Sequence, residues 1–501
     1  MNLTTDPWIP AVDKNGSTKP YSLQDLFVQA HELRDLAVKP HERIALMRLL
    51  LCITQAALDG PEDEAEWEAC RDLIQPRVDD YLKKWKTKFE LFGDGERFLQ
   101  VSNLKPAKAN DYGNSATKLD ISLAAGNNPT LFDNSAGESR SIAGNRAALN
   151  LLTFQCFSPG GLIGVAKWQG KDTPGKGSSK NAPCVASNML HAILIGPTLL
   201  DTVHLNLLTK EIVRDVYSEL GKPIWEQPLV DASDQPGLNN ASLTYLGRLV
   251  PLARCIALSE DGSSIILANG IDYPIFPSFR EATATIIQRK DELGLMPAST
   301  GRSLWRQLAP VTIRRRSSND NVSGPLALVH EVPFSEVALW VGALVTHKAK
   351  KAKVDDVVEG YYQMPSSMLD TPGRFAYERG VQHAEKAEVI LDKGVREYAK
   401  SLQTRPSTSK AKQNFWTRTE QNLSALFDVA RDLTPEENLP SSRWGESVRN
   451  AALDAYERSC PHQTPRQVQA YALGLRRLNT LLKPKTVKNQ KGTLHEQNKA
   501  Q

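Results

Sequence analysis

The sequence predicts an α+β protein in which a large mixed α/β N-terminal domain is followed by a C-terminal four-helix bundle. In the N-terminal part, apolar stripes with helical spacing alternate with β-like runs and turn-rich segments. Beyond two stretches rich in Pro, Ser and Gly, at 364–367 and 371–373, the pattern is almost wholly helical. We therefore expect an N-terminal domain over residues 1–365, a bundle over residues 372–483, and a basic, disordered tail over residues 484–501.

The first elements of the N-terminal domain are an extended segment and three helices. Residues 6–10 contain two prolines, which disfavour a helix. Helices are then expected over residues 22–36, 42–58 and 64–86. The second is the clearest, because apolar residues occupy most of its circumference. This pattern predicts a helix that is buried on most sides.

The later part of this domain mixes both periodicities. A helix expected over residues 141–157 separates two unusual loops. Short β-like runs follow at 255–258 and 265–267, within a turn-rich region. The apolar run 334–345 is interpreted as a helix that leads into a lysine cluster.

Four apolar stripes predict the helices of the C-terminal bundle. They lie at residues 375–402, 415–433, 444–456 and 468–482. Short connections between such helices favour antiparallel neighbours. This part also carries the positive charge, since from Leu369 onward there are 22 Lys and Arg against 15 Asp and Glu.

Composition excludes several classes of protein. The net charge of +4 is too small for a histone-like polycation, so any nucleic acid must bind to local patches. No apolar run approaches the length of a membrane span, and residues 1–6 do not resemble a signal peptide. The six cysteines are scattered and form no CxxC pair, which argues against a disulfide framework and a cysteine zinc site. We expect a cytoplasmic protein with no metal and no cofactor.

Two loops combine more Gly, Lys and Asn with apolar residues than any other region. The first covers residues 126–137, and the second runs from Ser158 to Lys180. Long loops are costly to order and usually carry function. Glycine lets a backbone approach a ligand closely, and lysine suits phosphate.

The second loop contains a near match to a phosphate-binding loop. Residues 170–176 fit the first seven positions of GxxxxGK[ST], but Gly177 stands where Ser or Thr should hold magnesium. No helix start follows, because Pro183 lies close behind. A nucleotide-binding enzyme that uses Gly170 to Lys176 is therefore an alternative, and a basic surface loop, which could face DNA, fits better.

Other signals leave the function open. The basic clusters at 314–316 and 348–353 suit either a solvated face or phosphate contacts. Leu131 and Phe132 either tuck their loop onto the core or reach toward DNA. No GxSxG, HExxH or paired-carboxylate pattern indicates catalysis. An interaction scaffold without direct DNA contact is a further alternative.

Several motifs resemble those of a known family. Residues 2–10 read N-L-T-T-D-P-W-I-P, and residues 105–111 read K-P-A-K-A-N-D. Both segments, with the turn at Pro159 to Gly161, resemble CasA, the large subunit of the type I-E CRISPR Cascade complex. The similarity covers nearly the whole chain.

The resemblance implies a protein that is not an enzyme. CasA-like subunits read the protospacer-adjacent motif (PAM) of target DNA from the minor groove, promote unwinding and R-loop formation, and provide the docking platform for a helicase-nuclease. The implied role is antiviral defence, and the implied partners are the other Cascade subunits, the crRNA guide and double-stranded target DNA. The degenerate minor-groove code suits a reader that licenses many targets while the guide reads sequence.

The resemblance also implies site residues. The family's PAM-reading glycine loop corresponds to Gly160, Gly161 and Gly164. Its loop that contacts guide and DNA corresponds to Thr130, Leu131, Phe132 and Asp133. Its glutamine wedge at the end of a hairpin falls on Lys348, next to Ala349.

Its lysine finger has no match, because no Lys lies between Lys222 and Lys290. Arg280, Arg248 or Arg254 would have to replace it. The positions expected to contact phosphate are Lys105, Lys108, Asn110, Lys167, Lys171, Lys176, Arg280, Lys350 and Lys351.

Overall fold

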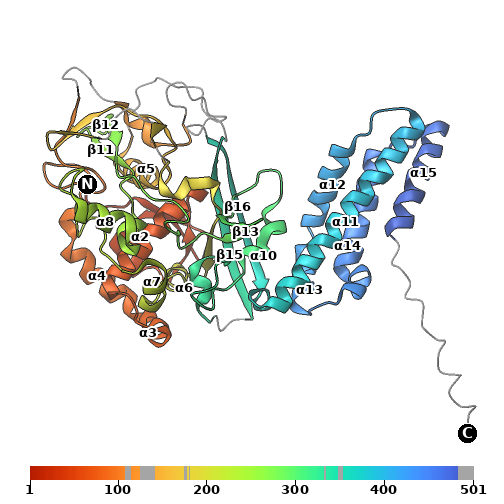
Figure 1. The fold of residues 1–501 in the computed structure, drawn as a ribbon, viewed down its shortest axis with the longest axis horizontal. Coiled ribbons are helices and arrows are strands. Elements are labelled where there is room, and N and C mark those ends of the chain that lie inside the picture. Colours follow the sequence, from red (N-terminus) through yellow and green to blue (C-terminus); the bar gives the residue numbers. More distant parts are fainter. Residues whose placement is uncertain are drawn as a thin grey trace, which may run out of the picture. The chain divides into compact units, whose positions relative to one another are not determined.

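The computed structural model divides into two compact units, an N-terminal unit over Met1–Met364 and a C-terminal unit over Pro365–Gln501 (Figure 1). Helices and sheets mix in the first unit, and the second is helical, so the α+β class is confirmed. The structure describes residues 1–107, 114–123, 142–173, 178–179, 181–331, 335–347 and 354–482.

Helix α2, Pro40–Leu58, lies at the centre of the N-terminal unit and confirms the clearest expected helix. Nearly all its side chains from His41 to Gln55 are buried. Helices α4 (Ile74–Lys84), α5 (Gly144–Phe157) and α9 (Tyr245–Leu249) pack against it. A helix that is apolar all round needs such cover on every side.

The other helices of this unit are short. They are α1 (Leu23–Val28), α3 (Glu64–Ala69), α6 (Leu199–Leu205), α7 (Lys210–Tyr217), α8 (Gln235–Leu243) and α10 (Leu308–Val311). The expected helix over 64–86 is wrong in its middle, where Cys70–Leu73 form a 3₁₀ turn. Pro76 has no N–H for the carbonyl of Asp72, so a regular α-helix cannot run through that turn.

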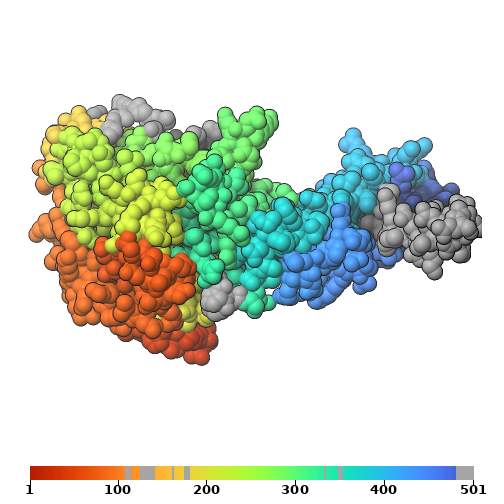
Figure 2. Space-filling model, turned by 60° about the horizontal axis from the view of Figure 1, so that its bottom comes forward, coloured from red at the N-terminus to blue at the C-terminus, as the bar shows by residue number. Residues whose placement is uncertain are grey.

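Segments far apart in sequence meet on one face of this unit. Figure 2 shows the red to orange N-terminal segment beside the yellow-green segment that follows residue 200. Two ion pairs join them, from Lys210 Nζ to Asp59 at 2.9 Å and from Arg214 to Glu62 at 2.5 Å. These ion pairs link the N-terminal segment to the segment that follows residue 200.

Two three-stranded sheets also belong to this unit. Strands β1 (Ile9–Asp13), β2 (Thr18–Tyr21) and β3 (Leu33–Leu36) form a sheet in the order β2-β1-β3. The expected helix over 22–36 is thus wrong beyond α1, because its second half is β3. A second sheet has the order β10-β15-β16, with β10 at His191–Ile195, β15 at Glu336–Thr346 and β16 at Val354–Pro365.

Strand β15 corrects the expected helix over 334–345. Almost every residue of β15 is buried, so both of its faces are covered. Such a strand shows no alternation of polar and apolar residues and cannot be told from a buried helix by periodicity. Its Val and Trp content was the signal for a strand.

The remaining strands of this unit form small sheets and two-stranded pairs. One has the order β11-β12-β5 and another the order β4-β7-β8, while β6 pairs with β9 and β13 with β14. Their bounds are β4 Leu104–Pro106, β5 Asn114–Ser115, β6 Gly161–Leu162, β7 Ala166–Trp168, β8 Lys171–Asp172, β9 Ser178–Ser179, β11 Arg254–Leu258, β12 Ser264–Asn269, β13 Ile286–Arg289 and β14 Glu292–Leu295. The β-like runs expected at 255–258 and 265–267 are confirmed as β11 and β12.

The C-terminal unit is a bundle around its longest helix, α11 (Thr371–Leu402). Helices α12 (Thr408–Glu420), α13 (Leu423–Arg431), α14 (Arg443–Ser459) and α15 (Pro465–Leu482) all contact α11. The helix expected over 415–433 is broken at Gln421 and Asn422. The side-chain amide of Asn422 donates to the carbonyl of Arg418 at 3.0 Å, which competes with backbone pairing.

The cysteines and several tryptophans of the chain are core residues. All six cysteines are free and buried, as expected of small core residues. Trp8, Trp168, Trp225, Trp305 and Trp340 are buried. None of the helices in the described ranges combines the length and apolarity needed to cross a bilayer.

Candidate nucleic-acid interface

The predicted glycine loop begins where α5 ends. Three successive residues after this helix are held by hydrogen bonds. The carbonyl of Ser158 accepts from the amide of Ala182 at 3.0 Å, and the carbonyl of Pro159 accepts from Arg254 Nη2 at 3.1 Å. The amide of Gly160 donates to Asn181 Oδ1 at 2.7 Å. The chain therefore enters the loop at a fixed position.

The three glycines of this loop have different environments. Gly160 is buried, and its N–H is already used by Asn181. Gly161 lies in β6, opposite Ser179 of β9. Gly164 is exposed, and a Cβ added there would meet nothing within 4 Å. A ligand can therefore approach the backbone at Gly164. We call residues 161–165 the glycine turn.

A lysine pair lies on the neighbouring sheet. In the ladder between β4 and β7, Lys105 is directly opposite Lys167, on the face away from the buried Leu104 and Trp168. Like charges opposite each other destabilise a sheet unless something offsets them. Lys167 Nζ lies 2.5 Å from Asp172, whereas Lys105 is exposed and makes no ion pair within the described ranges. Lys105 is therefore the lysine of this sheet best placed to meet an anion.

Lys171 is bonded to a loop of the protein. Its Nζ donates to Asp231 at 2.6 Å and to Ser233 at 2.8 Å. The hydrogen bond from Lys171 lowers the pKa of Asp231 to about 2, so this carboxylate stays charged. Lys171 holds a loop to β8, which weakens the expectation that it contacts phosphate.

The arginines expected to replace the lysine finger point inward. Arg248 is buried and donates to Glu281 at 2.7 Å and to the carbonyl of Pro274 at 2.6 Å. Arg254 is buried against Pro159. The expectation is wrong for these two. Arg280 donates to the carbonyl of Gly324 at 2.6 Å, and burial lowers its pKa to about 10.

Several predicted positions lie outside the described residues. They are Lys108, Asn110, Thr130, Leu131, Phe132, Asp133, Lys176, Lys348, Ala349, Lys350 and Lys351. The strands on either side of the wedge position are described, and β15 and β16 are neighbours in one sheet. Asn188 fixes the end of β15, since its Oδ1 accepts from the amide of Thr346 at 3.0 Å and its Nδ2 donates to the carbonyl of the same residue at 3.1 Å.

The near match to a phosphate-binding loop does not have the required fold. Gln169 and Gly170, both with positive φ, form the tight turn between β7 and β8. Ser178 and Ser179 then form strand β9. A phosphate-binding loop needs a helix at this point, because its first amides hold the phosphates. The structure therefore argues against the nucleotide-binding alternative.

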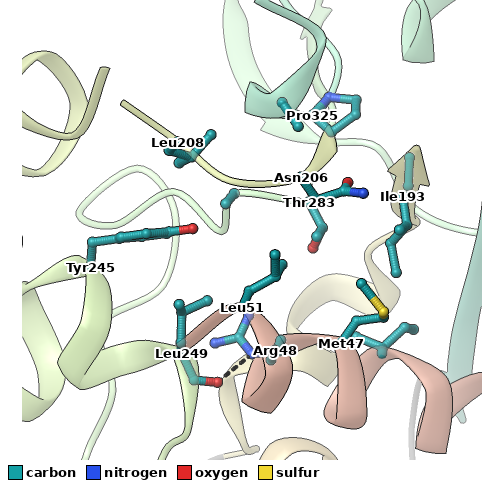
Figure 3. Close-up of a pocket in the computed structure, with 14 residues that line it drawn as sticks. Met47, Arg48, Leu51, Ile193, Asn206, Leu208, Tyr245, Leu249, Thr283 and Pro325 are labelled. Carbon is teal, nitrogen blue, oxygen red and sulfur yellow. Dashed lines mark hydrogen bonds between the residues drawn. The ribbon is translucent and has the colours of Figure 1, made fainter. Parts of the chain in front are cut away.

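The most strongly buried charges are structural. Arg48 of α2 donates to Glu281 at 2.6 Å and to the carbonyls of Leu249 and Arg248 at 2.8 and 2.7 Å. Figure 3 shows Arg48 and Leu249 beside a cavity of about 20 Å³, room for a single water. Burial alone would raise the pKa of Glu281, but Arg48 and Arg248 outweigh it and lower the pKa to about 2. This network ties α2 to α9 and to the loop that carries Glu281.

The family model of the CRISPR-associated protein Cse1 matches residues 2–455. The chain belongs to the Cse1 family. The resemblance read from residues 2–10 and 105–111 is thereby confirmed at the level of family. Within the described ranges, no three His, Cys, Asp or Glu side chains of this Cse1 protein are grouped to hold a metal ion.

Known relatives of this Cse1 protein extend over almost the whole chain. The CRISPR-associated protein CasA/Cse1 of Thermus thermophilus is 28% identical over 487 residues, which cover 91% of this chain and 92% of the relative. The solved structure of Thermus thermophilus CasA (Cse1) has a TM-score of 0.72 at 24% identity, covering 96% of this chain and 99% of that one. Cse1 from Acidimicrobium ferrooxidans has a TM-score of 0.75 at 20% identity, covering 96% and 97%.

A chain of a solved CRISPR RNA-guided surveillance complex also has the Cse1 fold. Its TM-score is 0.68 at 18% identity, and the match covers 96% of this chain and 99% of that one. At such identities these structures support the fold alone.

Proposed function

We propose that this Cse1 protein is the non-catalytic DNA-recognition subunit of a type I-E Cascade surveillance complex in the cytoplasm. It reads a PAM that flanks the target through the minor groove, using the glycine turn. The observation that carries the proposal is the exposed Gly164, with open space around its Cα, just before the lysine-bearing strand β7. The surveillance-complex chain with the same fold supports the assignment to such an assembly.

The geometry suits minor-groove reading. The groove is about 6 Å wide, so a backbone without side chains enters it more easily than a helix does. Contacts there separate A·T from G·C and little else, which gives a relaxed motif. Lys105 on the adjacent sheet is suited to a phosphate contact, which positions the duplex without reading sequence.

The remaining steps are assigned by family resemblance. The segment between β15 and β16 acts as the wedge that starts unwinding and R-loop formation. The C-terminal unit holds a displaced strand or neighbouring subunits, and the protein provides the docking platform for the helicase-nuclease. Its partners are the other Cascade subunits, crRNA and double-stranded target DNA, and its biological role is antiviral defence.

The experiment uses the complex that co-purifies with the full chain, its guide RNA and the other subunits. A pool of guide-matched duplexes with randomised flanking base pairs is bound, and the bound fraction is sequenced. Wild-type complex should enrich a small set of flanks. Gly164→Val should lower that enrichment at least about tenfold, the cost of one or two lost base contacts, with assembly intact.

Gly301→Val is the matched control, because Gly301 is also exposed with open space around its Cα. Gly160 is a poor test position, since it is buried and a side chain there would disturb the fold. Full enrichment in Gly164→Val would refute the role of the glycine turn. Absence of any DNA binding by the wild-type complex would favour a scaffold.

A further inference from the structure

The glycine turn is held at both ends by groups outside it. At its start, the segment 181–182 runs beside residues 158–160 through the bonds of Asn181 and Ala182. At its end, the amide of Ala166 donates to Thr173 Oγ1 at 3.0 Å, and the amide of Thr173 donates to the carbonyl of Ala166 at 2.9 Å. We infer that Asn181 is a positioning residue that sets the turn for base reading. This inference rests on the proposed function.

The contact of Asn181 replaces a backbone pairing. Its Oδ1 accepts the N–H of Gly160 at 2.7 Å, while the amide of its neighbour Ala182 donates to Ser158. The side-chain oxygen of Asn181 therefore adds a second hydrogen bond between segments 181–182 and 158–160, next to the backbone bond of Ala182. This second bond reaches Gly160, the residue that precedes the glycine turn. Because the N–H of Gly160 is already bonded to Asn181, base contacts fall to the residues that follow Gly160.

The chain before Gly160 is tied to α5 through Arg254. The carboxamide of Gln155, in α5, pairs with the backbone of Arg254: Arg254 N donates to Oε1 and Nε2 donates to Arg254 O, both at 2.9 Å. Both side chains are buried. From this block the guanidinium of Arg254 holds the carbonyl of Pro159. Burial lowers the pKa of Arg254 to about 10, so it is still charged at neutral pH and bonds strongly.

The contact of Asn181 can therefore be removed while the other hydrogen bonds around Gly160 remain. It is half-buried, and its removal breaks one hydrogen bond without leaving a buried charge. Recognition needs positions held to about 0.5 Å. Loss of the contact should therefore impair flank selection, whereas phosphate contacts and the affinity for any duplex should persist.

The experiment measures flank enrichment and affinity for a flank-scrambled duplex in the assembled complex. Asn181→Ala should lower enrichment about fivefold, the worth of one hydrogen bond of roughly 1 kcal/mol, with unchanged scrambled-duplex affinity and salt slope. Asn181→Asp keeps an acceptor for the Gly160 N–H and should restore the enrichment ratio. Asn239→Ala, which removes an exposed amide on α8, is the matched control.

The outcomes separate the two proposals. If wild type selects flanks and Gly164→Val does not, but Asn181→Ala selects as well as wild type, the positioning role is refuted and the proposed function survives. The same holds if Asn181→Asp fails like Asn181→Ala. If wild type selects no flank, the proposed function itself fails. A parallel fall in enrichment and scrambled-duplex affinity in Asn181→Ala would indicate a general structural role and would also refute positioning.

Discussion

Glu281 is a buried carboxylate that holds two buried arginines in the N-terminal unit. It is 5% exposed and pairs with Arg48 and Arg248, which are 3% and 2% exposed. Removing the carboxylate leaves two buried cations without their counter-ion. Glu281→Gln should therefore lower the free energy of unfolding by about 3–5 kcal/mol, measured by denaturant titration.

The matched control is Glu260→Gln, because Glu260 pairs with Arg97 but is 62% exposed. An exposed pair contributes about 0–1 kcal/mol. Equal effects of the two substitutions would show that the buried network is not a main source of stability.

The same carboxylate predicts a pH dependence. The pKa of Glu281 is lowered from 4.5 to about 2 in the folded protein. Its contribution to stability is therefore complete above about pH 4.5 and is lost as the pH falls toward 2. Glu281→Gln should show a shallower loss of unfolding free energy across this acidic range. An unchanged slope in the variant would assign the acid sensitivity to other groups.

Single residues also show what the sequence could not predict. Gly164 was found through its family resemblance, and its open surroundings suit the expected role. Asn181, Gln155 and Arg254 act through contacts with residues far along the chain, so no local pattern marks them. Arg248 was misread because a buried arginine and a projecting one look alike in sequence.

Among the elements, the sheet β4-β7-β8 predicts a salt-dependent effect. Lys105 is unpaired within the described ranges, whereas Lys171 is held by Asp231. Each neutralised phosphate adds about 0.9 to the slope of log K against log salt. Lys105→Ala should reduce this slope by about 0.9 for duplex binding by the complex. Lys171→Ala should reduce it less.

An equal loss of slope in both lysine variants would contradict the division of roles between them. Unchanged slopes in both variants would show that this sheet does not contact DNA. The Gly164 variants test the glycine turn separately.

The bundle predicts a packing effect at one close contact between helices. A Cβ added to Gly474 of α15 would lie 2.1 Å from Tyr456 Oη and 2.7 Å from the carbonyl of Gly394 in α11. Since one of these neighbours is backbone, the helices must separate. Gly474→Ala should destabilise the C-terminal unit by about 1–3 kcal/mol, measured by thermal unfolding.

Ala472→Ser, on the exposed face of the same helix, should change stability by less than about 0.5 kcal/mol. A neutral Gly474→Ala would show that α15 packs differently against α11.

Elements were predictable where one periodicity dominated. Helices α2, α5 and α14 agree with their apolar stripes. Strand β15 was missed because both of its faces are buried, and the break before α13 was missed because a single Asn interrupts an otherwise continuous stripe. In each case tertiary packing or a side-chain bond outweighed the local pattern.

At the scale of the whole molecule, family membership and fold support one account. The chain has the Cse1 fold over almost its full length, and its buried ionisable network is accounted for by packing. Gly164 offers exposed backbone close in sequence to Lys167 of β7, which pairs with Lys105 of β4, and this arrangement suits recognition of a duplex. We therefore place the glycine turn against the base pairs that flank the target.

Directed cleavage tests this claim most directly. All six native cysteines are buried, so Gly164→Cys provides an accessible thiol for an iron chelate that cleaves nearby DNA. In the assembled complex on a guide-matched duplex, cleavage should concentrate on the flanking base pairs. Gly301→Cys and the treated wild type are the controls. Cleavage centred elsewhere, or none above these controls, would contradict the account.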